Sequence, residues 1–117
     1  MNVKGISWLG VRTLAFDEMV TFYGHTLGLP RVGDDAGFAA FKLPDGTIIE
    51  VFATGSPGSE HFTTGPVAGF QVDDIEEARR ELEAAGIEFI GDIEGQRSRW
   101  SHFRGPDGNI YELSQPA

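Results

Sequence analysis

The chain contains an internal repeat, which restricts its fold more than any other feature of the sequence. Residues 41–52 (FKLPDGTIIEVF) and 103–114 (FRGPDGNIYELS) share six identical residues in twelve positions, without a gap and at a constant offset of 62. Residues 8–19 align with 67–78 at a slightly shorter offset. Two copies of a unit of about sixty residues indicate a duplicated module and not a solenoid, which needs more repeats.

Each copy has the pattern of a strand, a helix and further strands. Residues 6–14 and 67–72 alternate as strands do, and apolar residues at helical spacing follow each of them. We expect the helices to end at Gly28 and Gly86, because glycine is favoured just after a helix C-terminus. A Pro-Asp-Gly turn then joins the last two strands of each copy. The pattern predicts an α+β fold of two tandem βαβββ modules.

The two modules fit within one domain. A chain of 117 residues has the length of a single ordinary domain. We assign residues 5–52 to module one and residues 67–114 to module two of a domain that spans residues 1–117. Residues 53–66 are rich in Gly, Ser, Thr and Pro, and this composition predicts a linker or loop between the modules.

Composition excludes several classes of function. The chain has no cysteine, which excludes a disulfide scaffold, a zinc finger and a thiol nucleophile. Its net charge is −9 and it has no basic stripe, so nucleic acids and anionic membranes are not expected partners. The sequence shows neither a signal peptide nor a long apolar span, and we expect a cytoplasmic protein.

Short motifs in both copies carry a resemblance to a known family. The first predicted helix contains the pairs Phe22-Tyr23 and Leu27-Gly28, and the second copy closes with Pro-Asp-Gly-Asn-x-x-Glu-Leu at 106–113. With the duplicated unit, these motifs resemble the vicinal oxygen chelate superfamily, which includes glyoxalase I, extradiol dioxygenases and bleomycin-resistance proteins. The resemblance implies a cupped mixed sheet around one cavity between the modules, with the helices on its outer face.

The same resemblance implies where a metal would bind. In the family's metalloenzymes the ligands lie on the first and last strands of each module, which here correspond to Trp8, Glu50, Val67 and Glu112. Tryptophan and valine cannot coordinate a divalent ion, so we expect no complete metal site and no cofactor. A weakly bound divalent metal on Glu50 and Glu112 is the alternative, with His61 as the best placed histidine.

Strand parity predicts which side chains line the cavity. If Pro-Asp-Gly forms a tight turn at 105–108, Ser101 pairs with Glu112 and His102 pairs with Tyr111. This register directs His102 and Trp100 toward the helices. The residues expected to contact a ligand are Trp8, Arg12, Phe41, Phe52, Gln71, Arg99 and Phe103.

Two functions remain open from the sequence. The first is a metal-independent protein, similar to the bleomycin-resistance group, that binds a planar or aromatic small molecule, including a cationic one. The alternative is a glyoxalase-type lyase or isomerase in which Glu50 and Glu112 are catalytic, as base and residual metal ligands. Arg12 is expected to be the main cation of the cavity, bound to one of these glutamates or to a substrate carboxylate. In either case we expect a homodimer.

Overall fold

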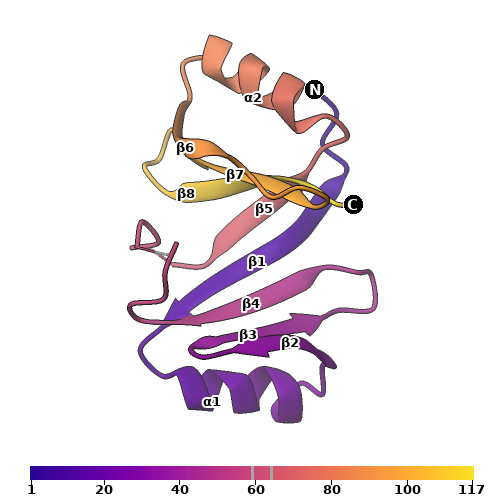
Figure 1. The fold of residues 1–117 in the computed structure, drawn as a ribbon, viewed down its shortest axis with the longest axis vertical. Coiled ribbons are helices and arrows are strands. Elements are labelled where there is room, and N and C mark those ends of the chain that lie inside the picture. The colour runs from indigo at the N-terminus through magenta and orange to yellow at the C-terminus, as the bar shows by residue number, and fades with distance from the viewer. Residues whose placement is uncertain (59, 64) are drawn as a thin grey trace. The chain divides into compact units, whose positions relative to one another are not determined.

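The computed structural model describes residues 1–58, 60–63 and 65–117, and its first module has the predicted order of elements. These elements are β1 (Gly5–Thr13), α1 (Phe16–Thr21), the π-helical turn η1 (Phe22–Thr26), β2 (Arg31–Asp35), β3 (Phe38–Lys42) and β4 (Ile48–Ala53). The strand order is β2-β3-β4-β1, in which β1 runs parallel to β4 and the other neighbours are antiparallel (Figure 1).

The second module repeats this arrangement. It contains β5 (Val67–Gln71), α2 (Ile75–Ala84), β6 (Glu88–Glu94), β7 (Arg99–Arg104) and β8 (Ile110–Gln115). Its strand order is β6-β7-β8-β5, again with the first strand parallel to the last. The α+β fold of two βαβββ modules is therefore confirmed. No helix in the described part of the chain is long and apolar enough to cross a membrane.

Backbone contacts divide the chain into two compact units. One is Trp8–Pro66, and the other combines Val67–Ala117 with the N-terminal residues Met1–Ser7. The N-terminal residues belong to the second unit because the Lys4 amide donates to the carbonyl of Gln71 over 2.9 Å. Each unit is built around its own core.

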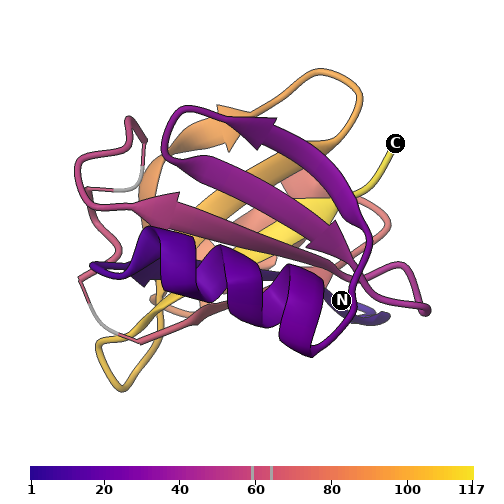
Figure 2. The ribbon, with the colours of Figure 1, turned by 90° about the horizontal axis from the view of Figure 1, so that it is seen from below.

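The core of the first module lies between its strands and its helix. Ala39, Phe41 and Val51 are buried, and α1 lies against the strands in Figure 2. Apolar residues of the helical segment and of the loop after it cover them: Phe16, Met19, Val20, Tyr23 and Leu29. The helical segment ends just before Gly28, as predicted. It differs from the prediction in that its second half is a π-helical turn.

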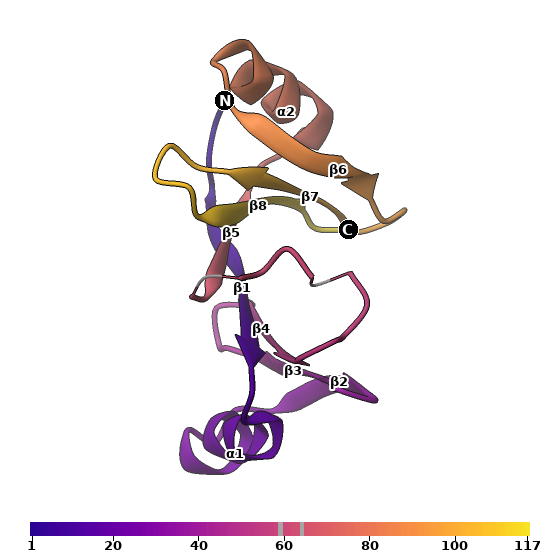
Figure 3. The same ribbon diagram turned by 90° about the vertical axis from the view of Figure 1, so that its left-hand side faces the viewer.

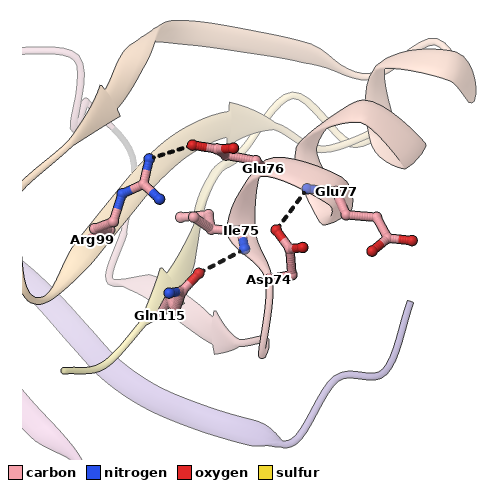
Figure 4. Close-up of polar contacts among 6 residues, drawn as sticks. All are labelled: Asp74, Ile75, Glu76, Glu77, Arg99 and Gln115. Atoms are coloured by element: carbon pink, nitrogen blue, oxygen red, sulfur yellow. Dashed lines mark hydrogen bonds and ion pairs between the residues drawn. The ribbon is translucent and has the colours of Figure 1, made fainter.

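The core of the second module lies beneath α2, which runs beside β6 in Figure 3. Its buried residues are Val72, Ile75, Ala78, Phe103 and Leu113. The Asp74 side chain caps the helix by accepting from the Glu77 amide over 3.1 Å, and the Gln115 side chain accepts from the Ile75 amide over 2.9 Å (Figure 4). These two bonds satisfy helix N-terminal amides that have no partner within the helix.

The predicted register of both hairpins is wrong by one residue. The Gly105 amide donates to the carbonyl of Asn109 over 2.8 Å, which leaves a three-residue loop of Pro106, Asp107 and Gly108. Gly108 has a φ of +87°, the left-handed conformation that closes a three-residue loop after a type I turn. The odd loop length moves every pair by one position, so His102 lies opposite Glu112.

This shift changes which face each residue of β3 and β7 occupies. His102 and Trp100 share the face of Glu112, contrary to the prediction. Three residues predicted to contact a ligand lie on the opposite, helix-packed face, and their assignment to the cavity wall was wrong: Phe41, Arg99 and Phe103.

Candidate functional site

The two glutamates singled out by the repeat occupy equivalent places. Glu50 on β4 lies opposite Gly10 on the parallel strand β1, and Glu112 on β8 lies opposite Gly69 on β5. In each module the glutamate therefore stands beside a glycine, on the face that does not pack against the helix. The structure confirms the correspondence between the two glutamates that the sequence repeat indicated.

In the first module the indole of Trp8 lies over Gly10 and reaches Glu50. The Nε1–H of Trp8 donates to Oε1 of Glu50 over 2.8 Å. A Cβ atom on residue 10 would lie only 2.1 Å from Cη2 of Trp8, so this ring position requires glycine there. Gly10 thus allows a side chain two residues away to bond the carboxylate on the neighbouring strand.

Two phenylalanines complete a cluster around this hydrogen bond. The ring centroid of Trp8 lies 6.2 Å from that of Phe52 on β4 and 6.1 Å from that of Phe62 in the 53–66 segment. Phe52 and Phe62 are 6.0 Å apart, so the three rings contact one another mutually. We call Trp8, Glu50, Phe52 and Phe62 the Trp8 cluster; all four belong to the unit Trp8–Pro66.

Glu50 is the one acid in this aromatic surrounding. Burial raises the pKa of Glu50 above its ordinary value, and the hydrogen bond from Trp8 opposes part of that shift. In the described part of the chain Glu50 forms no ion pair. A half-buried carboxylate with one neutral donor favours a ligand that brings a positive charge or further N–H groups.

Glu112 has a different partner in the second module. Nε2 of His102 lies 3.0 Å from Oε1 of Glu112, and both side chains are largely buried. Burial lowers the pKa of His102 to about 4, although the nearby charge of Glu94 opposes that shift. The imidazole is therefore neutral at pH 7, and in its Nε2–H tautomer it donates to Oε1 of Glu112. The pair can hold or move a proton.

The side chain that contacts the glutamate comes from a different strand in each module. Trp8 on β1 has Val67 as its counterpart on β5, and His102 on β7 has Ala40 as its counterpart on β3. The position that contacts the glutamate in one module thus carries a small or apolar residue in the other.

The expectation of an incomplete metal site stays a prediction, because Glu50 and Glu112 belong to different units. Among the residues that the structure describes, no three His, Asp or Glu side chains lie close enough together to hold an ion. In addition, Oε1 of Glu50 and Oε1 of Glu112 each accept or share a hydrogen bond within their own module.

The remaining predicted residues take other places. Arg12 shares the face of Glu50 but lies near the end of β1, where it is exposed and, within the described residues, forms no ion pair with Glu50; the expected bond to Glu50 was wrong. A bond to Glu112 or to a substrate carboxylate stays a prediction. Arg99 pairs with Glu76 of α2 over 2.9 Å (Figure 4). Gln71 lies opposite Ser114, on the face of Glu112.

Two residues of these clusters were not selected from the sequence as ligand contacts. His102 was directed to the wrong face by the assumed turn, and the odd loop length was the missing information. Phe62 lies in the 53–66 segment, whose composition predicted a loop but gave no sign that one ring would be buried. His61, the weak metal candidate, packs its ring edge against Phe62 with centroids 4.4 Å apart.

The fold and these positions agree with a family match. A model of the Glyoxalase/Bleomycin resistance protein/Dioxygenase superfamily matches residues 5–113. The chain belongs to this superfamily. A search of curated proteins found no match. Membership accounts for the paired βαβββ modules, whereas reactions differ among members that share a fold.

Solved structures share the fold at low sequence identity. Methylmalonyl-CoA epimerase from Mycobacterium tuberculosis is 22% identical, with a TM-score of 0.75 over 98% of this chain and 89% of its own. The Mn(II)-bound glyoxalase from Novosphingobium aromaticivorans is 23% identical, with a TM-score of 0.77 over 97% of this chain and 39% of its own. A superfamily member from Vibrio splendidus 12B01 is 17% identical, with a TM-score of 0.66 over 92% and 95% of the two chains.

Proposed function

We propose that this superfamily member binds a small planar aromatic molecule at the Trp8 cluster, without a resident metal. The observation that carries the proposal is the Trp8–Glu50 hydrogen bond within a group of aromatic rings. The flat faces of aromatic side chains suit planar molecules, and a half-buried carboxylate binds the polar group of such a molecule. The cluster therefore combines one contact for a ring with one for a cation.

The preferred ligand carries a positive charge in or near its ring plane. Glu50 forms no ion pair within the described residues, and the rings of Trp8 and Phe52 can interact with a cation through their faces. The net charge of −9 favours the approach of cations at long range. An amidinium or a similar flat cation satisfies both contacts.

Benzamidine and its neutral analogue benzamide test this proposal. Titrations in a Trp100→Phe background make Trp8 the sole tryptophan, so its emission reports on the cluster. We expect benzamidine to bind at least about tenfold more tightly than benzamide, and Glu50→Gln to remove that difference. Equal affinities in the unmodified cluster would contradict the role of Glu50, and no response to either compound would contradict the binding site.

A second candidate function rests on the contact between His102 and Glu112. A buried carboxylate with a neutral imidazole 3.0 Å away has the components of a general base, as a lyase or isomerase requires. In this reading Glu112 accepts a proton from an acidic carbon, and the His102 hydrogen bond holds its carboxylate in place. The name of one structural neighbour, methylmalonyl-CoA epimerase, suggests a thioester with an acidic α-carbon as the first probe.

Proton exchange tests this alternative directly. If Glu112 is a base, incubation of methylmalonyl-CoA with the protein in D2O exchanges its α-proton, and Glu112→Gln abolishes the exchange. His102→Gln, which keeps an N–H donor, should slow the exchange less. Exchange no faster than that of a protein-free control would count against this function for this substrate.

Metal content and assembly are separate predictions. We expect the purified protein to contain no stoichiometric zinc, nickel, manganese or iron, which elemental analysis measures. We also expect a homodimer, and light scattering that gives a mass near 12.7 kDa at micromolar concentration would contradict it.

A further inference from the structure

We propose that Phe62 occupies the place of the ligand's ring in the Trp8 cluster, so that an aromatic ligand binds by displacing it. This inference rests on the proposed function, because it concerns the same cluster. The inference specifies that the bound group of the ligand is a single six-membered ring. It also specifies that the phenyl ring of Phe62 competes with the ligand for the same space.

The contacts of Phe62 are those that a bound ring would form. Its centroid lies 6.1 Å from Trp8 and 6.0 Å from Phe52, with interplanar angles of 49° and 46°. These distances and tilts are typical of favourable aromatic pairs. The side chain is 3% exposed, so its ring takes up space that is shielded from water.

Phe62 differs from the other members of the cluster in how its backbone is held. Trp8, Glu50 and Phe52 lie on β1 and β4, whose pairing fixes their positions through successive residues from Trp8 opposite Ile48 to Thr13 opposite Ala53. Phe62 lies outside helices and strands, within a turn in which the Thr63 amide donates to the carbonyl of His61 over 3.0 Å. Segments outside the sheet open at lower free energy than paired strands.

Displacement has a definite thermodynamic consequence. If the ring of Phe62 and the ring of a ligand exclude each other, the measured dissociation constant equals the intrinsic one divided by the fraction of molecules with the site vacant. Removing the phenyl group then increases affinity, since every molecule is competent to bind. A truncated ring inside an apolar surrounding also leaves a space that can accept benzene.

The experiment compares Phe62→Ala with a matched control, Phe38→Ala. Phe38 also contacts Phe52, at 5.8 Å, but it is held on β3 of the same module. Benzene and benzamidine are the probes, measured by the shift in melting temperature and by Trp8 emission in the Trp100→Phe background. We expect Phe62→Ala to bind both at least about tenfold more tightly than the parent, and Phe38→Ala to show no gain.

The outcomes separate this inference from the proposed function. If benzamidine binds the parent but binds Phe62→Ala equally or more weakly, Phe62 is a fixed wall of the site; the inference is then wrong and the proposed function stands. If Phe62→Ala binds benzene but the parent binds neither benzamidine nor benzene, the variant has gained only an engineered cavity, and the proposed function and this inference are both wrong. Should Phe62→Ala fail to fold, Phe62→Leu replaces it, and an unchanged affinity there overturns the inference.

Discussion

The position of the Trp8 indole over Gly10 makes Gly10→Ala the sharpest test of the candidate site. A Cβ on residue 10 would lie 2.1 Å from Cη2 and 2.7 Å from Cζ2 and Cζ3 of Trp8. Carbon atoms are attracted at about 3.5–4 Å, so the indole must move by about 1 Å or more. A shift of that size separates Nε1 from Glu50, which it now meets at 2.8 Å.

The expected loss of stability follows from the contacts that such a shift breaks. An acceptor left unsatisfied in a buried place costs about 1–3 kcal/mol. Disturbing the ring pairs of Trp8 with Phe52 and Phe62 adds about 0.5–1.5 kcal/mol for each pair. Replacing glycine by alanine offsets about 0.4–1 kcal/mol through the unfolded chain. We therefore expect Gly10→Ala to lower the free energy of unfolding by about 1–5 kcal/mol.

Urea unfolding followed by circular dichroism measures this effect, with Gly33→Ala as the control. A Cβ on Gly33 would lie 3.7 Å from the Cβ of Ala40, an ordinary contact, so the control should change stability by at most about 0.5 kcal/mol. In a Trp8→Leu background, Gly10→Ala should lose most of its cost, because the clash partner is absent. Equal effects of Gly10→Ala with and without the indole would refute the placement of Trp8.

Three further predictions concern the charged pairs and the corrected register. Burial raises the folded-state pKa of Glu50, so the protonated carboxyl stabilises the fold. This stabilisation is full below the unfolded pKa and is lost as the pH rises through the folded pKa. Glu50→Gln should remove the loss of stability in urea unfolding at pH 4–8. The folded-state pKa of His102 is lowered to about 4, so stability should fall, by at most about 3 kcal/mol, as the pH falls from about 6.5 to 4, and His102→Gln should flatten that slope. Phe41→Ala and Phe103→Ala should each cost about 3–5 kcal/mol in unfolding free energy, as core residues do, and a smaller cost would contradict their helix-packed positions.

The sequence was sufficient for the architecture because the repeat and the local patterns agree. The spacing of Glu50 and Glu112 within their copies fixed the correspondence of the last strands, and the alternation of β1 and β5 fixed which residues share a face with them. Apolar residues on the other face explain why the helices pack there. None of these inferences depends on the geometry of a turn.

The face assignments for β3 and β7 failed because they did depend on a turn. A tight turn and a three-residue loop use the same Pro-Asp-Gly sequence, yet they differ by one residue in the strand pairing. One step in register exchanges the two faces of a strand. Phe103 therefore moved from the expected cavity wall to the core, and His102 moved from the core to Glu112.

The corrected register also changes how the inherited glutamates are understood. Arg12 was expected to bind one of them, but it is exposed and, among the described residues, forms no ion pair with Glu50. Neutral side chains contact them instead, the indole of Trp8 at Glu50 and the imidazole of His102 at Glu112. A neutral hydrogen bond leaves the charge of a carboxylate uncompensated, whereas a salt bridge would neutralise it. Each glutamate is thus held in position by a neutral partner, an arrangement that suits both cation binding at Glu50 and proton abstraction at Glu112.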